Sequence, residues 1–223
     1  MMNVVTRKLI VKELHVYRWL IAGAAVASIA SLLVCALGKT GLSIGSLTWL
    51  TTIIAYGVML ALYGIMNERK EQSLPFVLSL PLSIADYVRA KMLGLALCFL
   101  VVWLIASAGA LLLIFSVDSI PDGLVPYTVL LCVFMLANYS VVLCGTLHAQ
   151  SEALTSAVII VTNMGVSIYM FTIGPLPGIQ QHMWQAAPVW NSTFWTVLGW
   201  ELAVLVIAFA IPFFVAARRR DFL

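Results

Sequence analysis

The sequence predicts an all-α membrane protein with six transmembrane helices. Hydrophobic residues make up 63% of the 223 residues and charged residues 9%, whereas a soluble domain carries about 25% charged residues. The mean hydropathy is +1.07, and the long apolar runs lack the alternation of a membrane barrel. This composition excludes a soluble or disordered protein. A net charge of +3 on so apolar a chain also argues against nucleic acid as a partner.

Residues 1–18 precede the first apolar run and carry charges throughout. Lys8, Lys12 and His15 recur at the i, i+4, i+7 spacing of one helical face. This spacing predicts an amphipathic helix that lies in the cytoplasmic membrane interface. The alternative is a positively charged anchor that only fixes topology. A cleaved signal peptide is not expected, because no small-residue cleavage site follows a short apolar core.

Six apolar runs are long enough to cross a bilayer, and we expect residues 1–223 to form a single transmembrane domain. The expected spans are residues 19–37, 47–66, 92–116, 124–147, 154–173 and 195–217. The four cysteines lie inside these runs and form no Cys-x-x-Cys pair. They are therefore interpreted as small apolar side chains in helices, not as a disulfide or zinc framework.

The basic residues orient the bundle. Of the 12 Lys and Arg residues, 11 fall before the first span, between the second and third, or after the sixth. Cytoplasmic loops carry the excess of Lys and Arg, and an even number of spans brings these three regions to one side. Both termini and the segment 67–91 are therefore expected to face the cytoplasm. The twelfth basic residue, Lys39, is the exception, because it lies in a predicted turn on the other side.

The expected outer connections are mostly short. Residues 38–46 and 117–123 are interpreted as turns. Residues 174–194 form a longer, proline-containing segment, and four tryptophans lie in or near it: Trp184, Trp190, Trp195 and Trp200. Tryptophan prefers the membrane–water boundary, so we expect a short broken or re-entrant helix over the outer mouth. A plain loop with an ordinary aromatic belt is the alternative.

Two sets of small residues have the spacing of close helix packing. Gly41 and Gly45 have this spacing but fall in a predicted turn. Ala24 with Ser28, and likewise Ala27 with Ser31, lie inside the first span. We therefore expect the close helix contact to involve the first span.

A few polar side chains lie inside the expected spans. Glu201 lies about two turns into the sixth span, where a carboxylate costs several kcal/mol unless it is paired, neutralised or hydrated. It either lines a pathway or hydrogen-bonds to a neighbour near the outer interface. For Asn138 and Asn163 interhelical hydrogen bonding is the default interpretation, and a substrate pathway is the alternative.

Residues 67–91, "NERKEQSLPFVLSLPLSIADYVRAK", are the densest run of charge in the chain. Arg69 and Glu71 belong to a charged cluster at the end of the second span. Leu78, Leu80 and Leu82 follow between or beside two prolines, and "IADYVRAK" predicts a helix that opens into the third span. A short amphipathic helix between prolines fits a partner's groove.

This segment resembles the permease subunits of ATP-binding-cassette (ABC) transporters of the type-2 exporter family. Members have a charged cluster, a Leu-rich stretch, an "LP-x-S" motif and a "Lys-x-Leu" start of the next span. This chain has Glu68–Glu71, "LSLPLS" at 78–83, Tyr87 and "AKML" at 90–93. The usual Gly-Thr after the acidic residue is Gln72-Ser73 here. The expected topology and the basic tail "RRRDF" extend the resemblance to the whole chain.

The resemblance implies a permease that exports a substrate, pairs with a second permease chain, either identical or similar, and binds two copies of an ABC ATPase. ATP and magnesium would then be bound by the ATPase and no cofactor by this chain. Segment 67–91 would hold a coupling helix that docks on the ATPase. Its expected contacts are Arg69, Glu71, Leu78, Leu80, Leu82, Asp86 and Arg89. The implied location is the bacterial cytoplasmic (inner) membrane.

Two other functions are alternatives to export. The first fits the same resemblance: a membrane subunit of an ABC complex that handles haem or a cofactor. An autonomous channel or ion-coupled carrier would favour several buried charges or two broken spans in matching halves, and Glu201 is its one candidate. An enzyme is not expected, because the three histidines are scattered and no catalytic or metal motif occurs. "GKT" at 38–40 lacks the earlier glycine of a phosphate-binding loop.

Overall fold

The predicted apolar runs all form long helices. The computed structural model describes residues 4–67, 84–149 and 151–218. Within these residues, six helices are long and apolar enough to cross a membrane. The described part of the chain contains no strand. The expected all-α membrane architecture is therefore confirmed at this level.

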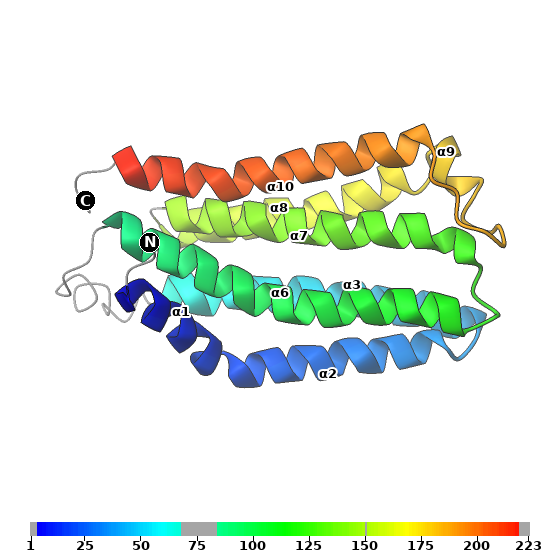
Figure 1. The fold of residues 1–223 in the computed structure, drawn as a ribbon, viewed down its shortest axis with the longest axis horizontal. Helices are drawn as coiled ribbons and strands as arrows, with labels where there is room; N and C mark the ends of the chain where they lie inside the picture. Colours follow the sequence, from blue (N-terminus) through cyan, green and yellow to red (C-terminus); the bar gives the residue numbers. More distant parts are fainter. Residues whose placement is uncertain (1–3, 68–83, 150, 219–223) are drawn as a thin grey trace.

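The helices run back and forth along one axis (Figure 1). In chain order they are α1 (Val4–Val16), α2 (Arg18–Cys35), α3 (Lys39–Ala61), the π-helical turn η1 (Leu62–Met66), α6 (Ile84–Ser116), the 3₁₀ turn η2 (Asp122–Leu124), α7 (Val125–His148), α8 (Glu152–Ile173), α9 (Pro177–Gln180) and α10 (Ser192–Arg218). The start of α1, the start of α6 and the end of α10 lie at one end of the bundle (Figure 1). The turn after α2 and helix α9 lie at the other.

The six long helices form two groups. One group contains α2, α3 and α6, and the other contains α7, α8 and α10 (Figure 1). Helix α7 joins them, because it packs against both α3 and α6, and α10 also contacts α6. The main apolar core lies among α2, α3, α6 and α7. The largest of its fully buried side chains is that of Phe99, which stacks on Tyr139 with ring centroids 3.9 Å apart.

Hydrogen bonds between helices accompany this packing. The hydroxyl groups of Tyr56 and Tyr139 donate to the carbonyl oxygens of Cys98 and Leu95 on α6, at 2.7 and 3.2 Å. The indole of Trp103 donates to the carbonyl oxygen of Cys132 on α7 at 2.8 Å. Tyr139 of the fourth span thus bonds to the third span. A polar group in an apolar bilayer needs such a partner.

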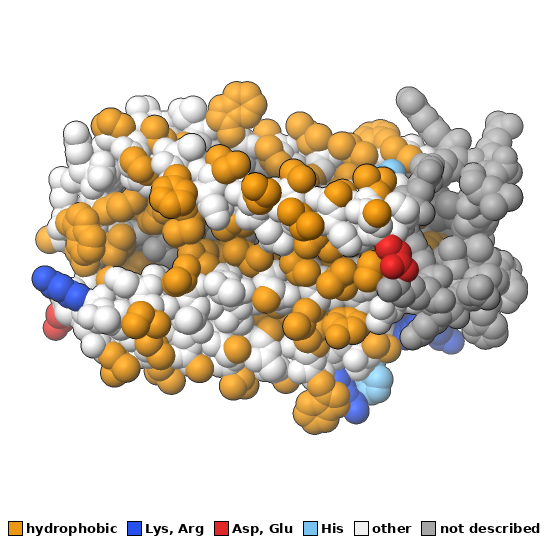
Figure 2. All heavy atoms as spheres, turned by 180° about the vertical axis from the view of Figure 1, so that it is seen from behind, with side chains coloured by type: hydrophobic (Ala, Val, Ile, Leu, Met, Phe, Trp, Pro, Cys, Tyr) orange, Lys and Arg blue, Asp and Glu red, His pale blue; other side chains and the backbone are white. Residues whose placement is uncertain are grey.

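The outward faces of α8 and α10 are apolar. Exposed hydrophobic side chains on them include Ile160, Met164, Ile168, Val206 and Phe214. Figure 2 shows hydrophobic side chains along the whole face, with Lys, Arg, Asp and Glu gathered at its two ends. A patch of this size does not persist in water, so these faces suit contact with lipid or with another apolar chain.

Helix α3 begins earlier than expected. Residues 38–46 were interpreted as a turn, and this interpretation is wrong, because the helix starts at Lys39. Hydroxyl groups near the start of α3 bond to backbone carbonyls of the preceding turn: Ser43 to Lys39 at 3.3 Å, and Thr48 to Ile44 at 3.0 Å. A hydroxyl satisfied in this way is tolerated in a membrane helix.

The Gly41–Gly45 pair consequently lies on a helix and not in a turn. A Cβ atom on Gly45 would lie 2.6 Å from the backbone nitrogen of Cys35 and 2.7 Å from the carbonyl oxygen of Ser31. Helices α2 and α3 therefore approach each other closely here, and Ser28 and Ser31 on α2 are buried. The first span does take part in the close contact, and the glycines of α3 supply its other side.

Candidate functional site

Two regions hold the residues that the sequence singled out. The first is the end of the bundle where α1, η1 and α6 meet. The predicted coupling residues Arg69, Glu71, Leu78, Leu80 and Leu82 lie outside the described residues. Asp86 and Arg89 lie in the first turns of α6, where Arg89 Nη1 and Asp86 Oδ1 are 3.9 Å apart. Both side chains are partly solvent-accessible, so this pair is a surface interaction.

Helix α1 is fastened to the start of α6. Lys91 Nζ donates to Glu13 Oε1 at 2.9 Å, and the side chains retain only 3% and 7% of their exposure. Ile10 is buried beside them. A Cβ atom on Gly94 would lie 2.8 Å from Glu13 Cγ, so the two helices touch closely. Breaking one side of a buried ion pair is expensive, so the pair fixes the register of α1 on α6.

The opposite face of α1 carries Lys8, Lys12 and His15, which are all exposed. Leu14 and Tyr17 pack instead against the main core. The interfacial amphipathic helix stays a prediction. Val11 and Val16 are also exposed.

Both ends of the charged segment reach this region. The π-helical turn η1 precedes the segment, and α6 follows it. Gly64 in η1 lies against α6, since a Cβ atom there would be 2.6 Å from Leu95 Cδ2. π-helical turns are rare and frequently mark functional positions. The charged segment therefore begins after η1 and ends in α6, which is the helix that α1 packs against.

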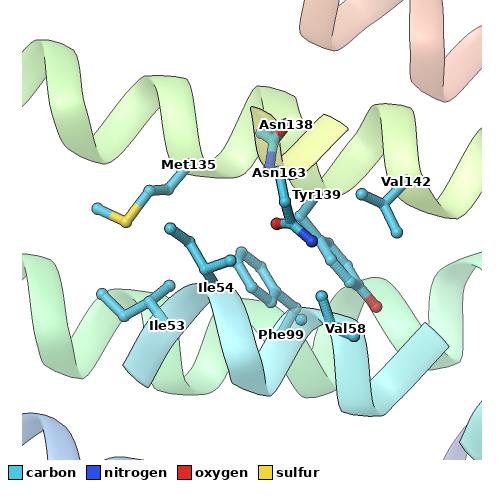
Figure 3. A pocket seen from close by; sticks show the side chains of 10 residues that line it. Ile53, Ile54, Val58, Phe99, Met135, Asn138, Tyr139, Val142 and Asn163 are labelled. Atoms are coloured by element: carbon cyan, nitrogen blue, oxygen red, sulfur yellow. The ribbon is translucent and has the colours of Figure 1, made fainter. Parts of the chain in front are cut away.

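The second region lies within the membrane-spanning part. Asn138 on α7 and Asn163 on α8 line one small pocket, together with Ile54 and Val58 of α3 and Phe99 of α6. Figure 3 shows the two asparagine side chains beside each other in this lining. The enclosed space of about 10 Å³ is close to what one water molecule requires. The two predicted asparagines therefore meet, although they come from different helices.

Glu201 lies on α10, nearer the end of the bundle that carries α9. It is 6% exposed and accepts a hydrogen bond at Oε1 from the Tyr169 hydroxyl group of α8. Its other oxygen, Oε2, is buried and has no hydrogen-bond partner among the described residues. Tyr169 in turn stacks on Phe134 of α7, with ring centroids 3.9 Å apart. The interpretation of Glu201 as bonded to a neighbour is thus correct for one of its two oxygens.

A groove between α7, α8 and α10 connects these polar groups. It measures about 430 Å³ and is lined by Asn138, Thr162, Tyr169 and Glu201 among mostly apolar side chains. Asn138 lines both this groove and the pocket with Asn163, whereas Glu201 lines only the groove, so the two spaces adjoin at Asn138 and are together called the polar region. Tyr169 and Asn163 are six residues apart on α8, which corresponds to about 9 Å along the helix.

The outer segment 174–194 contains one helical turn, α9. Ile179 of α9 is buried with Leu130 and Phe194. Asn191 fastens the segment twice, because its Oδ1 accepts from the Phe194 amide at 2.9 Å and its Nδ2 donates to the Gly178 carbonyl oxygen. The segment forms one four-residue turn, and the broken or re-entrant helix expected here stays a prediction.

Sequence reasoning missed Glu13, Lys91 and Tyr169 as site residues. Lys91 was counted as a topology charge and as part of the "AKML" motif at 90–93. A usable signal was present for Glu13, which is the only acidic residue among the first 67. An acid within a basic N-terminal segment suggests a specific partner. Nothing in the sequence connected Tyr169 with Glu201, since 32 residues separate them.

Comparisons of the chain with protein-family models, with curated proteins and with solved structures found no match. Within the described residues, no three His, Cys, Asp or Glu side chains gather as metal ligands would. The four cysteines are free thiols, and Cys35, Cys98 and Cys132 are buried. The functional argument therefore depends on the geometry of the two regions.

Proposed function

We propose that the chain is the permease subunit of an ABC transporter and exports a substrate with energy from a separate ATPase. The observation that carries the proposal is the buried Glu13–Lys91 pair. It joins an N-terminal helix to the helix that follows the charged segment, at the end of the bundle where that segment leaves and re-enters. A force applied to the segment would reach α6 and α1 together, because the two helices are packed as one unit.

The proposed partner sits on this end of the bundle. Two ATPase subunits, with ATP and magnesium, would dock on the segment 67–91 of two permease chains. Asp86 and Arg89 would orient the contact, and Leu78, Leu80 and Leu82 would provide its apolar anchor. Eleven of the 12 basic residues lie in the three regions expected at this end. This charge distribution supports a cytoplasmic orientation of both termini in a bacterial inner membrane.

The proposed pathway runs between the two groups of helices. The pocket at Asn138 and Asn163 brings α3 and α8 to the same place. These are the second and fifth spans, which line the path in the type-2 exporter family that the sequence resembles. Ala61 of α3 and Ile159 of α8 also share one small core cluster. A shift of α3 relative to α8 would therefore change the polar region first.

Purification of the tagged chain from its native membrane tests this proposal. We expect a subunit that is photolabelled by azido-ATP to co-elute with the chain. Leu80→Asp should abolish its co-elution, because a carboxylate would enter the apolar anchor. Asp118→Asn, on the exposed turn at the opposite end, should leave it unchanged. Co-elution that persists in Leu80→Asp would remove the segment from the contact, and absence of any photolabelled subunit would contradict the proposal.

One observation favours a second function, that of an autonomous ion-coupled carrier. Glu201 is a buried carboxylate with one oxygen unpaired among the described residues, and intramembrane acids often bind transported ions. Such a carrier would move its substrate in liposomes that contain only this chain and an ion gradient. Transport that depends on ATP and on a second protein would exclude it.

A further inference from the structure

The groove between α7, α8 and α10 has the size of a small-molecule site. Its volume of about 430 Å³ falls within the range of roughly 300–1,000 Å³ for such sites. Its walls are mostly apolar and come from all three helices, including Val141, Ile173 and Val204. A few convergent polar groups in an apolar groove are typical of ligand binding.

The polar end of the groove is an incompletely satisfied acid. Tyr169 occupies Oε1 of Glu201, while Oε2 is buried without a hydrogen-bond partner in the described part of the chain. Among the described residues, no Lys, Arg or His lines the groove, so this part of the chain supplies no counter-ion there. Leaving a buried carboxylate oxygen unpaired is costly in an apolar surrounding. A positive ligand group would relieve this cost.

Aromatic rings line the same groove as this carboxylate. Phe134 and Tyr169 stack on each other, and Trp200 precedes Glu201 on α10 and lines the same groove. Faces of aromatic rings attract ammonium groups, and this attraction grows when water is excluded. A bare metal ion would need several more oxygen ligands, and beside Glu201 the lining offers few. The combination therefore favours an organic cation with an apolar body.

We propose that this groove binds a lipophilic organic cation, with its ammonium group at Glu201 Oε2 and its apolar part along α7 and α8. As the substrate class of the exporter, this inference rests on the proposed function. Binding itself needs no ATPase, so the two can fail separately. If the ATPase co-purifies but no cation binds, the permease proposal is retained and the proposed substrate class is rejected. If a cation binds and no ATPase is found, the binding site is retained and the permease proposal is rejected.

The test compares two molecules of the same shape. Tritiated benzyltrimethylammonium is bound to the purified full chain in nanodiscs, and unlabelled competitors are added. Neopentylbenzene replaces the charged nitrogen by carbon and keeps the shape. We expect unlabelled benzyltrimethylammonium to compete at least about tenfold better than neopentylbenzene. Equal competition by the two would overturn the proposal, because the charge would then contribute nothing.

Variants locate the site. Glu201→Gln keeps the shape and an acceptor for Tyr169, and it should weaken cation binding at least about tenfold, the loss expected on removing one buried charge partner. The control Asp118→Asn removes an exposed carboxylate on the turn before η2 and should bind as the original chain does. If Glu201→Gln does not fold, Phe134→Leu takes its place. It removes an aromatic wall and should weaken binding several-fold, and unchanged binding in the tested variant would overturn the proposal.

Discussion

Lys91 Nζ lies 2.9 Å from Glu13 Oε1, although 78 residues separate them in the chain. The pair is nearly excluded from solvent and joins α1 to the start of α6. The end of the charged segment that enters α6 is therefore joined to α1 as well as to α6 itself. The following predictions test this arrangement and the packing around it.

Removing one member of the Glu13–Lys91 pair should destabilise the protein strongly. Glu13→Ala or Lys91→Ala removes one side of a buried ion pair, and we expect a loss of about 3–5 kcal/mol. The apolar double change Glu13→Leu with Lys91→Met should cost much less than either single change. The measurement is the free energy of unfolding by SDS titration in mixed micelles.

The exposed pair Asp86–Arg89 provides the control. Arg89→Ala should change the free energy of unfolding by less than about 1 kcal/mol, because exposed pairs at this spacing contribute little. Equal losses at Arg89 and Lys91 would show that burial of the Glu13–Lys91 pair has no energetic weight.

Close packing of α2 on α3 should make Gly45 intolerant of a side chain. Gly45→Ala would drive a Cβ atom into backbone atoms of Cys35 and Ser31, so we expect a loss of about 1–3 kcal/mol. Gly23→Ala on α2 meets no atom within 4 Å and should be neutral or stabilising, because alanine favours the helix. The same SDS titration compares the two. A stable Gly45→Ala variant would contradict the close approach.

Phe99 should be the most sensitive aromatic position of α6. It is 2% exposed and lies between Tyr56 and Tyr139, so Phe99→Ala should cost about 3–5 kcal/mol through the cavity that it leaves. Phe115 on the same helix is 61% exposed, and Phe115→Ala should change the stability by about 0.5 kcal/mol or less. Similar effects at both positions would place the core elsewhere.

Labelling of single cysteines tests the orientation. In a background without the four native cysteines, Lys8→Cys and Asp118→Cys are each exposed positions at opposite ends of the bundle. A membrane-impermeant maleimide should label Asp118→Cys in intact cells and Lys8→Cys only after permeabilisation. The opposite pattern would place the termini and the charged segment outside and would exclude a cytoplasmic ATPase as the partner.

The six spans were predictable from the sequence, because an apolar run of this length has few other stable structures. The start of α3 was not, because residues 38–46 contain three glycines and were interpreted as a turn. In the helix the hydroxyl groups of Ser46 and Thr48 bond to carbonyls of the preceding turn, and a sequence pattern does not reveal such bonds. The close-packing role of Gly45 was missed for the same reason.

The polar region was predicted in its members but not in its geometry. Asn138, Asn163 and Glu201 stood out because polar side chains are costly in a membrane. Their meeting depends on how α7, α8 and α10 pack, which no local pattern specifies. Likewise, the charges near Lys91 predicted its side of the membrane, while its partner Glu13 depends on where α1 docks.

ATP hydrolysis in a reconstituted complex tests the central claim most directly. The chain is purified with its co-eluting ATPase and placed in nanodiscs, and vanadate-sensitive ATP turnover is measured for the original chain, for Leu80→Asp and for Asp118→Asn. We predict turnover that responds to added lipophilic cations in the original chain and in Asp118→Asn, and loss of that response in Leu80→Asp. If no ATPase accompanies the chain, or if Leu80→Asp responds as the original chain does, the charged segment does not couple ATP hydrolysis to transport.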